Sequence, residues 1–209
     1  MNTTGASYNG LVAGDNLSVS ATGLFSDKNV GVGKSVALTN SYSGTDLGNY
    51  TITDQTGTTA DITPKGLTIS GITADNKVYD GTTSATVNTT GVNYSGIVSG
   101  DNLSVSATGL FSDKNVGVGK SVALTTSYSG SDLGNYTITD QATTTADITP
   151  RSVTVSGITA DNKVYDGNTL ATVNTGGASY SGILSGDDLS VSPTVTKSVL
   201  RAPEAHKII

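Results

Sequence analysis

The stretch Gly14–Thr39, GDNLSVSATGLFSDKNVGVGKSVALT, recurs letter for letter as Gly100–Thr125. Its Asp-x-Leu-Ser-Val-Ser element, at Asp15 and Asp101, returns a third time at Asp187, so the chain repeats every 86 residues. A repeat this faithful, without insertion or deletion, is typical of arrays that add length and valency rather than build one unique pocket.

The repeat divides the chain into four parts. Residues 65–150 form a complete copy, which we call the second copy. The first copy, residues 1–64, lacks the N-terminal strands, and the third copy, residues 151–192, holds only the N-terminal half. Residues 193–209 depart from the repeat and contain the single His of the chain, so we interpret them as an aberrant, disordered tail.

The composition indicates a β-protein without disulfides. Thr, Ser, Gly, Asn, Asp and Val dominate, and these residues favour strands and turns over helices. There is no Cys, which excludes disulfides and thiolate metal sites. The net charge of −6 argues against nucleic acid as a partner, and the short apolar runs argue against membrane insertion.

Apolar residues alternate with polar ones at several places in the second copy, which is the pattern of half-buried strands. These places are Leu67 and Ile69; Val78; Ala85 and Val87; Leu103, Val105 and Ala107; Val122 and Leu124; Tyr136 and Ile138; Ala146 and Ile148. Turn-rich segments separate them. We therefore expect an all-β fold of tandem immunoglobulin-like antiparallel β-sandwich units, with about seven strands per repeat.

Two local motifs refine this expectation. Asp80-Gly81, which follows Tyr79, is typical of a two-residue type I′ turn, so we expect a hairpin there and structural roles for all three residues. Asp132-Leu-Gly134-Asn-Tyr136-Thr-Ile138 resembles a tyrosine corner. In that motif the tyrosine hydroxyl bonds back to the chain just upstream, and Ile138 takes the place of a core cysteine.

Five ordered segments resemble the YDG repeat domain, which occurs in tandem in large bacterial surface and secreted proteins of the filamentous-haemagglutinin, two-partner-secretion type. The resemblance covers residues 1–192 and implies β-sandwich segments of a stalk, with no catalytic residues to carry over. The segments are Lys77–Val87, Val98–Asp101, Asp113–Gly117, Gly134–Thr137 and Ala146–Pro150.

Other chemistry finds little support in the repeats. Asn115–Ser121 is similar to a phosphate-binding loop but leads into a strand-like segment instead of a helix. Calcium stays an alternative for the turn residues Asp101, Asp113 and Asp132, although no Asp-x-Asp-x-Asp spacing occurs. His206 lies in the tail, so we expect neither an enzyme nor a cofactor.

The expected function is a structural stalk repeat of a secreted or cell-surface bacterial adhesin, which extends and presents other domains. The alternative is a weak, multivalent module that binds a host glycan or protein through Tyr94 and Tyr128. Neighbouring repeats of the same chain are the expected partners. Because a strand with an unpaired edge can pair with a strand of another molecule, we also expect head-to-tail self-association through the incomplete end copies.

Overall fold

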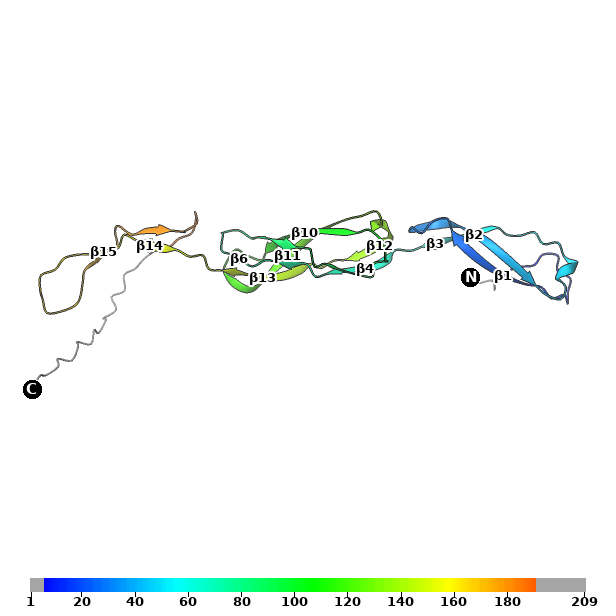
Figure 1. Cartoon of the computed structure of the whole chain (residues 1–209), viewed down its shortest axis with the longest axis horizontal. Coiled ribbons are helices and arrows are strands. Elements are labelled where there is room, and N and C mark those ends of the chain that lie inside the picture. The colour runs from blue at the N-terminus through cyan, green and yellow to red at the C-terminus, as the bar shows by residue number, and fades with distance from the viewer. Residues whose placement is uncertain (1–5, 191–209) are drawn as a thin grey trace, which may run out of the picture.

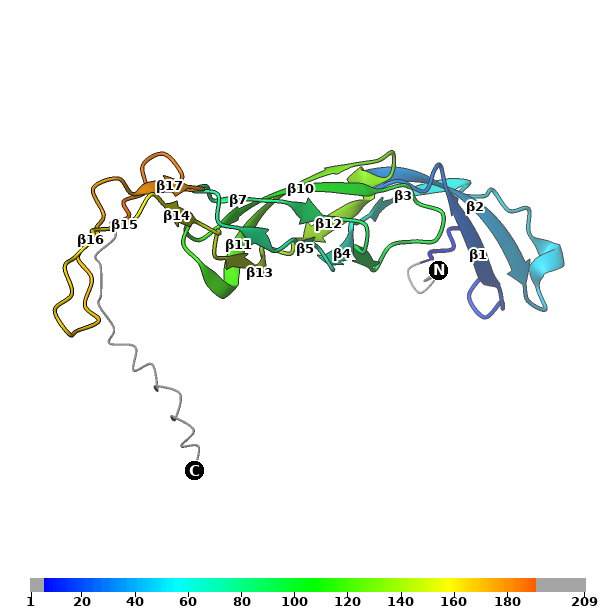
Figure 2. The ribbon, with the colours of Figure 1, turned by 60° about the vertical axis from the view of Figure 1, so that its left-hand side comes forward.

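The computed structural model describes residues 6–190 and confirms the all-β class. Apart from two single-turn 3-10 helices, η1 (Leu47–Asn49) and η2 (Leu133–Asn135), these residues form strands, turns and loops. The three copies follow one another in an extended row, and both views show the same order without folding back (Figures 1 and 2). The predicted tail, residues 193–209, lies outside the described residues.

The first and third copies contain few strands. In the first copy β1 (Ser18–Phe25), β2 (Gly31–Ser43) and β3 (Gly57–Ile62) form one antiparallel sheet in that order. The third copy has two short antiparallel pairs, β14-β17 and β15-β16. Their bounds are β14 (Thr154–Ser156), β15 (Thr159–Ala160), β16 (Val173–Asn174) and β17 (Ser179–Ser181).

The second copy contains three sheets, with strand orders β6-β13-β11-β10-β7, β12-β4-β9 and β5-β8. Every predicted strand overlaps one of them, although Leu103 lies just before β10. The bounds are β4 (Lys65–Ser70), β5 (Thr73–Ala74), β6 (Lys77–Val78), β7 (Ser84–Ala85), β8 (Val87–Asn88), β9 (Asn93–Ser95), β10 (Ser104–Phe111), β11 (Gly117–Ser129), β12 (Tyr136–Thr139) and β13 (Thr143–Thr149).

Two apolar clusters fill the second copy. One surrounds the buried Leu67, Ile69, Ile72 and Tyr136, and the other comprises Phe111, Val122, Ala146 and Ile148. Most of these residues are the inward members of alternating strands, since successive side chains point to opposite faces. The period-two pattern therefore identified the buried face of the strands correctly except at Val78, which is 53% exposed.

Strand number and direction differ from the expectation of about seven antiparallel strands. The second copy has ten strands, and β12 runs parallel to β4, as β6 does to β13. Parallel neighbours need a long connection. The intervening strands of the copy supply that connection, because β4 opens the copy and β12 comes near its end.

The expected hairpin at Asp80-Gly81 is wrong. Only glycines have positive φ in residues 6–190, so Asp80 cannot take the first central position of a type I′ turn. The flanking strands also pair elsewhere, β6 with β13 and β7 with β10. Lys77 holds the loop instead: its Nζ lies 2.8 Å from Asp80 Oδ1 and donates to the Thr82 carbonyl at 2.9 Å.

Gly109 in β10 is the position where the core of the second copy admits no side chain. A Cβ there would lie 2.7 Å from Val87 Cγ2 and 2.8 Å from Val122 Cγ1. Because valine side chains are stiff, we expect Gly109→Ala to destabilise the protein by about 1–3 kcal/mol in urea denaturation. Gly134→Ala is the matched control, since nothing lies within 4 Å of its Cβ. Equal stability of the two variants would contradict this packing.

Candidate functional site

Tyr136 ties the start of β12 to the loop between β9 and β10. Its hydroxyl donates to Asp101 Oδ2 at 2.6 Å and accepts from the Val98 backbone N–H at 2.9 Å. Burial and the bond to Asp101 raise the pKa of Tyr136. The expected bond to the chain just upstream is wrong: the partners lie 35 and 38 residues earlier. Backbone bonds of the η2 turn already satisfy that nearer segment.

Asp132 holds the same loop from a second side. Its Oδ2 accepts from the Asn102 backbone N–H at 3.0 Å and from Ser131 Oγ at 2.9 Å. These bonds, and then Lys28, keep the pKa of Asp132 below its usual value. Gly134 lies in η2, and Ile138 is half-buried against the Leu67 cluster.

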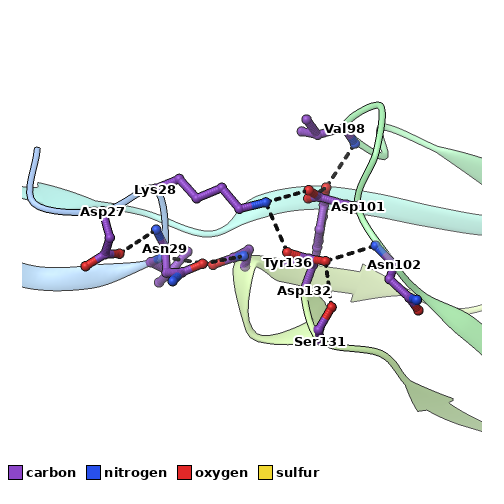
Figure 3. A network of polar contacts seen from close by, with 11 residues as sticks. Asp27, Lys28, Asn29, Val98, Asp101, Asn102, Ser131, Asp132 and Tyr136 are labelled. Atoms are coloured by element: carbon purple, nitrogen blue, oxygen red, sulfur yellow. Dashed lines mark hydrogen bonds and ion pairs between the residues drawn. The ribbon is translucent and has the colours of Figure 1, made fainter.

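A lysine from the first copy enters this arrangement. Lys28, between β1 and β2, places its Nζ 3.1 Å from Asp101 Oδ1 and 3.2 Å from Asp132 Oδ1 (Figure 3). The two carboxylates, Asp101 first, raise the pKa of Lys28. The Asp101 and Asp132 side chains are 9% and 14% exposed, so the ammonium meets two largely covered anions.

Asn135 completes the contact with two neutral hydrogen bonds. Its Oδ1 accepts from the Val30 backbone N–H at 2.9 Å, and its Nδ2 donates to Asn29 Oδ1 at 3.3 Å. We call Asp27–Val30 the tip, and Asp101, Asp132 and Asn135 the socket. Because hydrogen bonds are directional and an ion pair is not, the amide contacts fix the orientation in which the tip meets the socket.

The boundary between the second and third copies uses the same carboxylate position. Tyr79 donates its hydroxyl to Oδ1 of Asp187, the counterpart of Asp101, at 2.8 Å. A Cβ on Gly81 would lie 3.4 Å from Leu184 Cδ1. The Tyr-Asp-Gly motif is therefore a contact between copies. Within it Asp80 serves the loop itself, and Lys77, followed by Thr82, lowers its pKa to about 2.

The same tip sequence has different surroundings at this second boundary. Val116 is 51% exposed, whereas its counterpart Val30 is half-buried beside the socket. The same tip sequence is therefore packed against a socket at the first boundary and largely exposed at the second.

The tyrosines suggested for ligand binding belong to the core. Tyr94 and Tyr128 are both half-buried and pack against the Leu67 cluster, and the Tyr128 hydroxyl bonds to Asp140. Sequence reasoning missed Lys28 and Asn135 as contact residues. The sequence does show that both residues recur, as Lys114 and Asn49. The repeat spacing alone, however, does not reveal which residues of the neighbouring copy they contact.

The glycine-rich loop that is similar to a phosphate site is already occupied by carboxylates. Gly119 donates its N–H to Asp147 Oδ1 at 2.7 Å, and Lys120 pairs with Asp113 at 2.7 Å. Among residues 6–190 no group of three or more potential metal ligands converges. No helix in this part of the chain has the length and apolar character to span a bilayer.

Removal of one hydroxyl tests the anchoring of the socket. Tyr136→Phe removes the donor to Asp101 Oδ2 and the acceptor of the Val98 N–H, so we expect a loss of about 1–3 kcal/mol in the free energy of unfolding. Tyr94→Phe is the control, because within the described residues its hydroxyl makes no hydrogen bond. Urea denaturation followed by circular dichroism measures both, and equal losses would contradict the anchor.

Comparison with protein families shows the family of this chain. The family model described as the YDG domain matches residues 1–59, 63–146 and 149–204. No curated protein and no solved structure matches the chain. The three matches recur with the copies and together span most of the sequence, so the chain belongs to the YDG domain family.

Proposed function

We propose that this chain is a stalk segment of a secreted or cell-surface bacterial adhesin of the filamentous-haemagglutinin, two-partner-secretion type. In this proposal each complete repeat is an immunoglobulin-like β-sandwich, and tandem copies extend and present other domains without performing catalysis. The observation that carries the proposal is the seating of the tip of one copy in the socket of the next.

The linker between the first and second copies supports this function. Only Thr63 and Pro64 separate β3 from β4, and proline restricts both its own backbone and that of the residue before it. A two-residue linker combined with the four polar contacts of the tip allows little bending between the copies. A stalk requires resistance to bending, which a semi-rigid rod provides.

Multivalent binding has less support. Tyr94 and Tyr128 are committed to the Leu67 cluster, so neither offers a free aromatic face to a sugar. A glycan array probed with the whole chain separates the two functions, because the stalk proposal expects no saturable binding. Saturable binding that Tyr94→Ala abolishes would favour the binding module.

The tip should limit bending at the first boundary. The chain has no cysteine, so spin labels can be attached at Leu24→Cys and Leu110→Cys, two exposed positions in β1 and β10. We expect a narrow distance distribution by double electron–electron resonance, which Lys28→Met broadens and Lys114→Met leaves unchanged. A broad distribution in the parent chain would contradict a rod, and an equal effect of both variants would contradict the contact.

The contact should also respond to acid. The pKa of Asp132 is lowered, so its stabilising effect is complete above the ordinary value of 3.8 and is lost as the pH falls toward the lowered pKa. The pKa of Lys28 is raised above 10.5, so its contribution is lost only at more alkaline pH. We expect the label distances to be narrow at neutral pH and to broaden reversibly in acid.

Added salt should also broaden the distribution of label distances at neutral pH, because salt screens exposed ion pairs. Circular dichroism at each pH checks that the strands persist. Identical distance distributions at neutral pH and well below pH 3.8 would rule out an electrostatic contribution to the boundary.

A further inference from the structure

The first copy has an open groove of about 680 Å³ on one face of its sheet. Apolar and aromatic residues from β1, β2 and the segment after η1 contribute to its lining. Six of them are Leu17, Val19, Leu38, Tyr42, Tyr50 and Ile52.

The second copy shows what covers these residues. Their counterparts, 86 positions later, pack against the buried Leu67, Ile69 and Ile72. These three residues belong to β4 and the turn after it. The groove of the first copy is therefore the place that β4 fills in the second copy. The six counterparts are Leu103, Val105, Leu124, Tyr128, Tyr136 and Ile138.

The third copy presents the matching strand. Val153, Val155 and Ile158 are the counterparts of Leu67, Ile69 and Ile72, and they are 38%, 37% and 46% exposed. In the second copy the same positions are 1%, 2% and 1% exposed. The third copy thus exposes apolar side chains at the repeat positions that are buried in the second copy.

The backbone edges are complementary as well. Tyr50–Thr53 has the same sequence as β12, yet it forms no strand, whereas β12 pairs with β4. Within residues 6–190, β14 pairs with β17 alone, while β4 lies between β12 and β9. An unpaired edge with exposed apolar residues is a template for another strand.

A glutamine clamp is also present on the acceptor side. In the second copy Gln141 accepts from the Ile72 N–H at 2.9 Å and donates to the Ile72 carbonyl at 2.7 Å. Gln55 stands at the same position in the first copy, beside the groove. It can hold the backbone of Ile158 in the same way.

We propose that the groove of the first copy binds the strand Arg151–Ile158 of a second molecule of this chain. The register of β12 and β4 pairs Tyr136 with Lys65 and Ile138 with Leu67, so Tyr50 pairs with Arg151 and Ile52 with Val153. Donor and acceptor lie at opposite ends of the molecule (Figure 1), so the contact is head-to-tail. This association does not depend on the stalk function.

The first and third copies overlap, because residues 1–20 and 173–192 both correspond to residues 87–106 of the second copy. Ser7–Asn9 and Ser179–Ser181 both correspond to β9, the other neighbour of β4. Only one of them can lie beside the donated strand. Either segment can take this place: β14 can bind in the groove together with its partner β17, or it can separate from β17 and pair with Ser7–Asn9.

Sedimentation velocity over a range of protein concentrations tests the association. We expect the mass of the parent chain to rise with concentration, and Val155→Asp to weaken association at least about 100-fold, because it places an unpaired charge against the apolar residues of the groove. Val164→Asp is the matched control, since Val164 is 88% exposed and its counterpart Val78 stays 53% exposed in the complete copy. A parent chain that remains monomeric, or equal effects of the two variants, would overturn the proposal.

A disulfide test fixes the register. The chain has no native cysteine, so an Ile52→Cys variant can be mixed with a Val153→Cys variant and oxidised. Adjacent strand positions lie within disulfide reach, so we expect a covalent heterodimer. Mixing with Val164→Cys instead is the control. Heterodimers formed equally well with Val164→Cys would show non-specific collision and refute the assigned register.

Discussion

A single carboxylate, that of Asp101, connects the fold of a copy with the contact between copies. One of its oxygens accepts from Tyr136 of its own copy, and the other faces Lys28 of the preceding copy. The tyrosine holds the loop against the core, and the loop then presents the anion to the lysine. Its counterpart Asp187 accepts from Tyr79 at the next boundary. The same position thus serves two different donors from the neighbouring copy.

The small energy of the boundary contact is compatible with the proposed stalk function. An exposed ion pair contributes little to stability, and the Lys28 side chain is 70% exposed. The contact therefore does little to stabilise each copy. Together with the directional bonds of Asn135 and a two-residue linker, it instead restricts orientation. This restriction applies to the boundary between the first and second copies, which lie in one extended row (Figure 1).

The chain also contains internal controls for the effect of tertiary context. Tyr-Thr-Ile-Thr is strand β12 in the second copy, where β4 lies beside it, and forms no strand at Tyr50–Thr53. Val153 and Leu67 occupy one position of the repeat but are 38% and 1% exposed. Strand formation and burial at these positions depend on the presence of the complementary half.

The sequence by itself determined the period, the all-β class and the inward residues of the main strands, such as Val122 and Ile148, because alternation is a local property of the chain. The tertiary structure decided the rest. Two of its features join residues that are remote in sequence: the parallel pairing of β4 with β12 and the position of Lys28 between two aspartates. A third, the loop at Asp80-Gly81 that Lys77 holds, has a backbone conformation that differs from the expected turn. Local patterns carry no information on which distant edges and charges meet, because that depends on how the sheets pack.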